Sequence, residues 1–141
     1  MPTYNRAEYI MDAIKSVRQQ TYPNWELLVI DDQSTDDTVK LITALKDERI
    51  NLLKTTQRCG ITKTRNEGLI KTQGEFVAFI DSDDLWAATK LEKQVAALQQ
   101  YPGAGFCLTG GYNFRKLNEP VEFFYKQKDG ILYGNFFISF F

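Results

Sequence analysis

The segment Phe76-Val77-Ala78-Phe79-Ile80-Asp81-Ser82-Asp83-Asp84 decides the fold, because an unbroken apolar run passes directly into an acidic run. The length of the apolar part and its polar boundaries predict a strand buried on both faces, as in a parallel sheet. Ligands of open parallel α/β sheets bind beyond the carboxyl ends of the strands. The acidic run from Asp81 to Asp84 is therefore the first candidate for a ligand site.

Helical and strand-like spacing alternate on both sides of this segment. Ser34 and Asp37 form a candidate capping box for one of the helices. We predict helices over residues 7–20, from Ser34 to about Lys46, from Thr62 or Thr64 to near Gly74, and over 90–100, and strands over 25–30, 50–53, 76–80 and 105–109, with short strands near 112–115 and 122–125. The alternation predicts an α/β fold with a mainly parallel sheet flanked by helices.

Length and composition narrow the class of protein. The 141 residues fit a single domain over residues 1–141, and the 43% hydrophobic fraction predicts a packed core. The net charge of −1 argues against a nucleic-acid partner, because such proteins usually carry a basic excess. The absence of histidine excludes Ser-His and Cys-His catalysis and any His-ligated zinc site.

Sequence features also bear on the compartment. Cys59 and Cys107 are far apart and lack metal-ligand spacing, which is typical of reduced cysteines in a cytoplasmic protein. No apolar run reaches the roughly 18 residues needed to span a bilayer, and no signal peptide is recognisable. We expect a cytoplasmic protein without a transmembrane segment, with a peripheral position at the inner membrane face as the alternative.

Two acidic clusters follow predicted strands. Asp31-Asp32 follows one strand, and Asp81, Asp83 and Asp84 follow another, so neighbouring strands would bring five carboxylates to one crevice. Two like charges 4 Å apart repel by about 4 kcal/mol at an effective dielectric constant of about 20. A hard divalent cation, Mn²⁺ or Mg²⁺, would offset this repulsion and also take phosphate oxygens from a substrate. The alternative is that the aspartates cap helices and turns.

Four motifs follow one another along the chain. They are Pro2-Thr3-Tyr4-Asn5-Arg6, Gln20-Thr21-Tyr22-Pro23-Asn24-Trp25-Glu26 with Val29-Ile30-Asp31-Asp32-Gln33-Ser34-Thr35-Asp36 behind it, residues 60–74 with Arg65-Asn66 and Gly68, and Asp81-Ser82-Asp83 as a D-x-D motif. Each motif is weak alone, but the four in order are specific, and together they resemble the family-2 glycosyltransferases. The resemblance implies the A-type nucleotide-diphospho-sugar transferase (GT-A) fold, which is Rossmann-like.

The resemblance also implies roles for individual residues. It implies a nucleotide-binding set made of Pro2, Thr3, Tyr4, Asp32, Arg65 and Asp81. Within that set, Tyr4 would stack on the base, and Asp32 would accept a hydrogen bond from a ring N–H such as that of uracil. Asp83 would be the main metal ligand, with Asp81 as the second.

By this resemblance the parent protein would be an inverting, metal-dependent enzyme of the hexosyltransferase type. It would transfer sugar from a nucleoside-diphosphate sugar, expected to be UDP-linked, to a hydroxyl of a glycan or lipid-linked acceptor in polysaccharide biosynthesis. The family's general base lies downstream, so we expect it beyond Phe141 and expect no catalytic residue within this chain. The alternative is an inactive nucleotide-binding module or remnant that lacks the acceptor half.

Both ends of the chain are unusual. Only Met1 to Tyr4 precede the first predicted helix, so the first strand would be absent or cut short, and its neighbours would be left unpaired. The chain stops inside the apolar run 135–141. We therefore expect a fragment truncated at both ends, whose exposed apolar surface favours self-association.

Several residues have a structural alternative to the binding role. Tyr4 could be a core aromatic residue, Arg65 could form a salt bridge with Glu67 or another surface acid, and Asn66 could serve the start of a helix. Trp86 is expected to pack against the core rather than face a sugar, and residues 136–141 are expected to be core. A phospho-acceptor domain also has an acidic pair after a strand, but the Asp81 cluster and its flanking motifs fit that class poorly.

Overall fold

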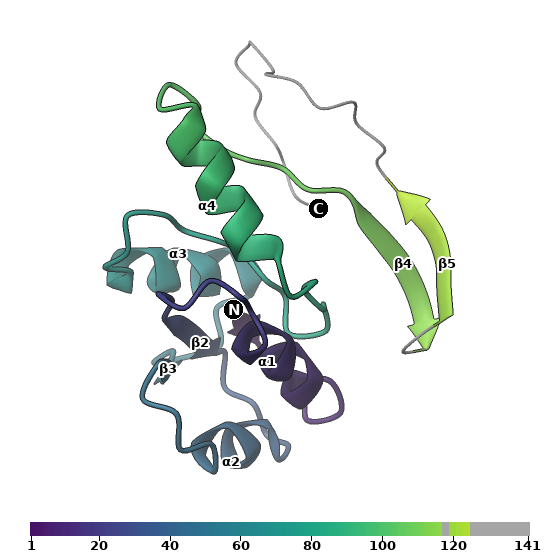
Figure 1. Cartoon of the computed structure of the whole chain (residues 1–141). Coiled ribbons are helices and arrows are strands. Elements are labelled where there is room, and N and C mark those ends of the chain that lie inside the picture. The colour runs from purple at the N-terminus through teal and green to yellow at the C-terminus, as the bar shows by residue number, and fades with distance from the viewer. Residues whose placement is uncertain (117–118, 125–141) are drawn as a thin grey trace. The chain divides into compact units, whose positions relative to one another are not determined.

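The computed structural model describes the backbone of residues 1–116 and 119–124 and the side chains of residues 1–111 (Figure 1). The chain divides into two compact units, Met1–Val95 and Ala96–Phe141. Helix α4 (Lys90–Gln100) runs across that division and has the bounds predicted from the sequence. No helix in the described part of the chain is both long enough and apolar enough to cross a bilayer. A single domain over residues 1–141 stays a prediction.

The first unit contains a three-stranded parallel sheet with the order β1-β2-β3. Its strands are β1 (Pro2–Thr3), β2 (Leu27–Asp31) and β3 (Ile50–Lys54). In the register, Thr3 lies opposite Asp31, and Asp31 lies opposite Lys54. The carboxyl ends of all three strands therefore meet at one edge, and the predicted parallel sheet is confirmed.

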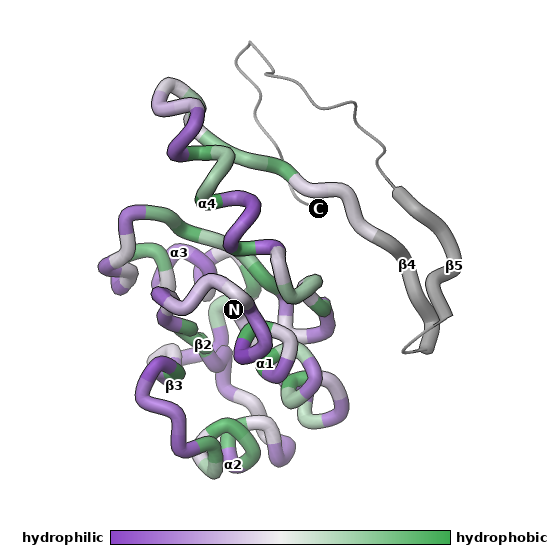
Figure 2. Tube along the Cα trace, in the orientation of Figure 1, coloured by the Kyte–Doolittle hydropathy of each residue, from purple (hydrophilic) through white to green (hydrophobic). Residues whose placement is uncertain are grey.

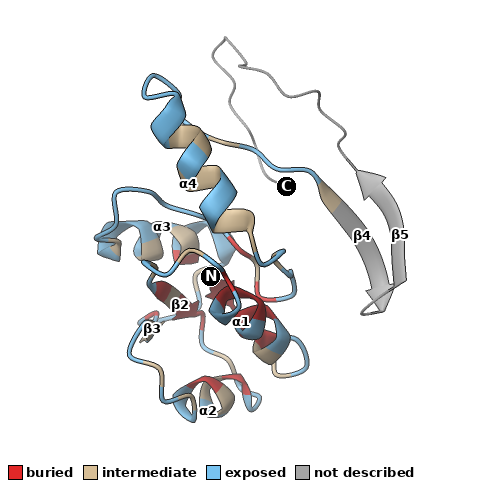
Figure 3. Cartoon of the chain, in the orientation of Figure 1, coloured by how far each residue is buried: buried red, intermediate tan, exposed pale blue. Residues whose placement is uncertain are grey.

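Helices cover both faces of this sheet, in agreement with the predicted α/β fold. The helices are α1 (Ile10–Arg18), α2 (Thr38–Thr43) and α3 (Ile61–Lys71). Leu27 and Val29 of β2 pack with α1 and α2, while Ile30, which points to the opposite face, contacts α3 at Gly68. Apolar and polar residues alternate along α1 (Figure 2), and its buried positions gather on one side (Figure 3).

The core of this unit follows the helical spacing seen in the sequence. Its buried apolar residues come from α1, β2, α2 and the segment before the acidic run: Ile10, Ile14, Val17, Leu27, Val29, Ile42 and Ile80. Full burial of one such side chain contributes roughly 1.5–3 kcal/mol. These contacts hold the carboxyl edge of the sheet in place.

Gly68 gives a direct test of the packing between α3 and the sheet. A Cβ atom at this position would lie 3.2 Å from Ile30 Cγ1, so the Ile30 side chain would have to shift by a few tenths of an ångström to admit a larger residue. We expect Gly68→Leu to lower the free energy of unfolding by about 2 kcal/mol through overpacking, measured by urea unfolding. Gly103→Leu is the control, because nothing lies within 4 Å of its Cβ position. Equal stability of the two variants would contradict the close contact.

Two predicted strands are not formed. Residues 76–80 form no paired strand, and Val77 and Phe79 are exposed whereas Ile80 is buried. A strand requires a neighbour for its backbone groups, and β1 offers only two residues. Residues 105–109 also lack strand pairing, with Phe106 and Leu108 exposed. The expectation that the neighbours of a short first strand are left unpaired agrees with residues 76–80 but is wrong for β2, which pairs with β1.

The remaining secondary-structure predictions are mostly confirmed. The short strands expected near 112–115 and 122–125 form an antiparallel pair in the second unit, β4 (Gly111–Lys116) with β5 (Glu119–Phe124). The predicted capping box at Ser34 is wrong: α2 begins after Asp37, with no side-chain cap, and Ser34 Oγ accepts from Asn5 N–H instead. The apolar run 135–141 lies outside the described residues.

Candidate functional site

The residues predicted to bind a nucleotide lie at the carboxyl edge of the sheet. Pro2 and Thr3 form β1, Tyr4 follows it directly, and Asp32 follows β2. The backbone N–H of Asp32 donates to the carbonyl of Thr3 at 2.8 Å, which fixes the two strand ends side by side. This edge is where ligands bind in open α/β sheets.

Asp32 organises the loop that follows β3. Its carboxylate is buried and accepts three hydrogen bonds: from Cys59 N–H at 2.8 Å, from Gly60 N–H at 2.8 Å and from the Thr55 hydroxyl at 3.1 Å. Burial raises the pKa of Asp32, but these hydrogen bonds outweigh it, and the net pKa is lowered. An ionised carboxylate has about four acceptor positions, so Asp32 can accept one further hydrogen bond.

Tyr4 is not a core aromatic residue. Its ring stacks under the guanidinium of Arg58, whose central carbon lies 3.8 Å from the ring centroid. Arg58 belongs to the loop that Asp32 holds between Thr55 and Gly60. Sequence reasoning missed Arg58; the available signal was a basic residue in a loop at the carboxyl edge of the sheet.

Arg65 contacts Asp81, which lies sixteen residues away in the chain. Its Nη2 atom lies 2.6 Å from Asp81 Oδ1 and 2.9 Å from Oδ2, so Arg65 does form a salt bridge with an acid, as its structural alternative expected, but the partner is Asp81 and not Glu67. Two buried polar atoms at this edge have no hydrogen-bond partner, Arg65 Nε and the hydroxyl of Thr3. A buried donor left without an acceptor costs about 1–3 kcal/mol, so a ligand oxygen would be stabilising here.

Asp83 also pairs with an arginine. Arg6 Nε lies 3.5 Å from Asp83 Oδ2, and both side chains are about half exposed. Asp84 is also exposed, but partial desolvation raises its pKa, and the charges of Asp81 and Asp83 raise it further. Arg6 belongs to the first of the four motifs, but no role was predicted for it from the sequence.

The acidic run is anchored at both ends. Ile80 belongs to the core before it, and Trp86 packs against the same core after it, as predicted. The N–H of Trp86 donates to Ser16 Oγ at 3.1 Å, and the Gln20 side chain donates to the Ala87 carbonyl at 2.8 Å. The two anchors fix the backbone around the run, while the tips of Asp81 and Asp83 remain partly exposed.

The carboxylates do not converge as the sequence suggested. Asp31 is buried and accepts from Ser34 N–H, and Asp32 holds its loop, so neither joins the acidic run. Among residues whose side chains are described, no three acidic or cysteine groups are gathered for a metal ion. The donors at Asp81 and Asp83 are hard oxygens that suit Mn²⁺ or Mg²⁺, but each is engaged by an arginine.

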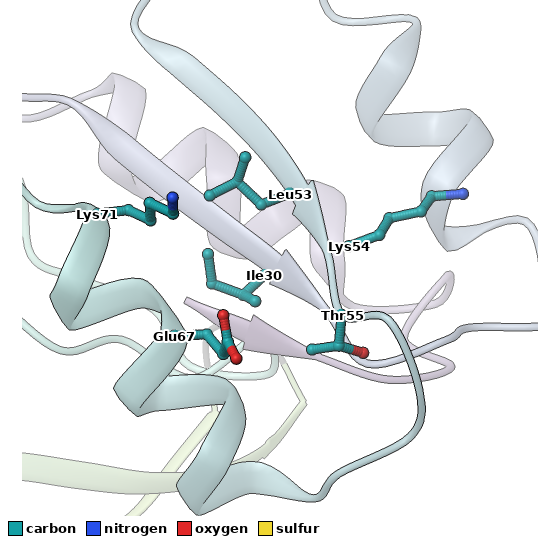
Figure 4. A pocket seen from close by; sticks show the side chains of 6 residues that line it. All are labelled: Ile30, Leu53, Lys54, Thr55, Glu67 and Lys71. Carbon is teal, nitrogen blue, oxygen red and sulfur yellow. The ribbon is translucent and has the colours of Figure 1, made fainter.

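Two cavities lie beside α3, one against β2 and β3 and the other against the loop that follows β3. One of about 140 Å³ is lined from α3 by Glu67 and Lys71, which point toward Ile30 and Leu53, while Lys54 points away (Figure 4). The other, of about 290 Å³, is lined by Thr55, Thr56, Gln57, Cys59, Lys63, Asn66, Glu67 and Ile70. Asn66 therefore borders a cavity from the middle of α3 and does not start the helix.

Comparison with known proteins identifies relatives over most of the sequence. Glycosyl transferase family 2 matches residues 1–137. TuaG of Bacillus subtilis (strain 168) is 36% identical over 136 residues, which are 95% of this chain and 54% of that protein. The Escherichia coli UDP-Glc:alpha-D-GlcNAc-diphosphoundecaprenol beta-1,3-glucosyltransferase WfgD is 46% identical over 98 residues, covering 70% of this chain and 39% of that protein.

Solved structures show the same fold. The crystal structure of S. aureus TarS residues 1–349 superposes with a TM-score of 0.68 at 31% identity, covering 72% of this chain and 31% of that one. The same TarS fragment has also been solved with UDP and with UDP-GlcNAc. The chain thus spans about half or less of the length of these relatives.

Proposed function

The chain belongs to glycosyl transferase family 2, and on that basis we propose that it binds the nucleoside-diphosphate sugar of a sugar-transfer reaction. The donor would be UDP-linked, as in the TarS complexes and in the donor named for WfgD. Transfer to a hydroxyl acceptor would proceed with inversion. The acceptor would be a glycan or a lipid-linked glycan bound largely by the remainder of a longer protein.

One observation supports the proposed nucleotide site. Among the residues that the structure describes, the buried hydroxyl of Thr3 and the buried Nε–H of Arg65 find no partner, and both belong to residues for which the family resemblance implies nucleotide binding. A nucleoside diphosphate supplies the missing oxygens, since ribose and phosphate oxygens accept hydrogen bonds and a guanidinium suits phosphate. Asp32 retains one acceptor position for a ring N–H of the base.

Mn²⁺ or Mg²⁺ fits the donor chemistry of the acidic run. Asp83 and Asp81 would hold it through carboxylate oxygens, together with diphosphate oxygens. When bound, the ion would supply positive charge to the departing diphosphate. The chain would hold these carboxylates on an anchored backbone, and Arg65 beside them would bind phosphate oxygens.

Thermal unfolding tests the binding function. We expect UDP with Mn²⁺, at about 100 times the dissociation constant, to raise the melting temperature by about 10 °C, because the ligands bind only the folded chain. UDP alone and Mn²⁺ alone should each give a smaller shift. No shift at millimolar UDP and Mn²⁺ would contradict a nucleotide site.

An inactive binding module is the second candidate function. In this case the chain would bind the nucleotide without transferring sugar. Release of UDP from UDP-glucose or UDP-GlcNAc, measured beside the thermal shift, separates the two functions. Binding without turnover supports the module, and turnover by this chain would contradict it.

A further inference from the structure

Both carboxylates proposed to hold a metal ion are paired with an arginine from another segment. Arg65 contacts both oxygens of Asp81, and Arg6 contacts Asp83 at 3.5 Å. With Asp84, the run has a formal charge of −3, and the two arginines reduce it to −1. The cations that offset repulsion within the run in the free protein therefore come from the chain itself.

The Arg6 side chain can exchange its ion-pair partner while its backbone stays in place. Its backbone is fixed, because its N–H donates to the hydroxyl of fully buried Thr38 at 2.8 Å, and its carbonyl accepts from Ile10 N–H at 2.9 Å where α1 begins. Its side chain is 42% exposed, and the paired Asp83 side chain is 48% exposed. Exposed ion pairs contribute little to stability, so the tip of Arg6 can leave Asp83 without disturbing the fold.

We propose that Arg6 is an exchange residue of the nucleotide site: it occupies Asp83 in the free protein and transfers to the diphosphate when a divalent cation and the nucleotide bind together. The proposal rests on the proposed function. An ion held by Asp83 and by diphosphate oxygens would place those oxygens close to Arg6, and a guanidinium binds phosphate well.

The exchange makes the two ligands dependent on each other. A metal ion alone must displace Arg6 and leave it without an anion, whereas a metal ion with UDP gives Arg6 a new partner. Binding free energies are reciprocal, so UDP must raise the affinity for Mn²⁺ by the same factor by which Mn²⁺ raises the affinity for UDP. Arg6 is therefore expected to contribute to this coupling factor.

Titration of Mn²⁺ followed by electron paramagnetic resonance, with and without saturating UDP, measures the coupling without any turnover. In Arg6→Gln we expect the affinity for Mn²⁺ alone to rise about threefold to fivefold, the scale of an exposed ion pair. The affinity with UDP present should fall by a similar factor, so the coupling factor should drop about tenfold. Arg6→Lys should keep most of the coupling.

Arg18→Gln is the matched control, because the Arg18 side chain is 49% exposed and forms an ion pair with Asp47 away from the site. It should change neither affinity. If Arg6→Gln shifts Mn²⁺ affinity equally with and without UDP, or leaves it unchanged, the exchange is overturned while the nucleotide site stands. If the parent chain binds neither UDP nor Mn²⁺, the proposed function fails as well.

Discussion

Asp83→Asn is expected to weaken Mn²⁺-dependent binding of UDP by at least about 100-fold. Loss of a partner that only supports a metal ligand commonly costs about 10- to 100-fold, and Asp83 is proposed as a ligand itself. Asparagine keeps the size of the side chain but removes its charge and one of its two carboxylate oxygens. Calorimetric titration of UDP in the presence of Mn²⁺ measures the effect.

The fold should survive this change. Asp83 is about half exposed, and its only described side-chain partner is Arg6, so the melting temperature should stay within about 2 °C of the parent. Asp37→Asn is the matched control, since Asp37 is an exposed aspartate paired with Lys40 and lies outside the acidic run. Equal UDP affinities of the parent and Asp83→Asn would remove Asp83 from the metal site.

Elements set by local periodicity were predictable from the sequence. The helix over 90–100 and the strands around Leu27 and Ile50 depend on apolar spacing within a few residues. Such spacing can be read without knowing which element packs against it. The edge on which the candidate site lies followed from the same pattern. Ligands of such a sheet have one favoured place, the carboxyl ends of the strands.

The failed strand predictions share a physical cause. Residues 76–80 have the composition of a buried strand, but a strand forms only when another backbone supplies hydrogen bonds, and β1 supplies two residues. Ser34 fits a helix cap by spacing, yet Asn5, distant in sequence, takes its hydroxyl. Composition and spacing do not specify such partners.

The same limit applies to the site. Tyr4, Asp32, Arg65 and the acidic run were recognised because they belong to ordered motifs. The stacking of Arg58 on Tyr4 and the ion pair of Arg6 with Asp83 depend on tertiary contacts across 54 and 77 residues (58 − 4 and 83 − 6), and no local pattern encodes them.

Asp32→Ala is expected to lower the free energy of unfolding by about 3 kcal/mol and the melting temperature by about 10 °C. The substitution removes the acceptor of three hydrogen bonds and leaves the N–H groups of Cys59 and Gly60 without it at the start of α3. Asp32→Asn keeps one acceptor oxygen and should lower the free energy of unfolding by about half as much as Asp32→Ala. Urea unfolding of the three proteins at pH 7 provides the measurement.

The pH dependence of the stability distinguishes the effect of the Asp32 charge from the effect of its side-chain packing. The pKa of Asp32 is lowered in the folded chain, so its contribution is complete above the ordinary aspartate pKa of about 3.9 and is lost as pH falls through the folded value. The stability difference between the parent and Asp32→Ala should therefore be constant from pH 7 to 5 and shrink toward pH 3. A difference that stays constant to pH 3 would mean that packing, and not the ionised carboxylate, holds the loop from Thr55 to Gly60.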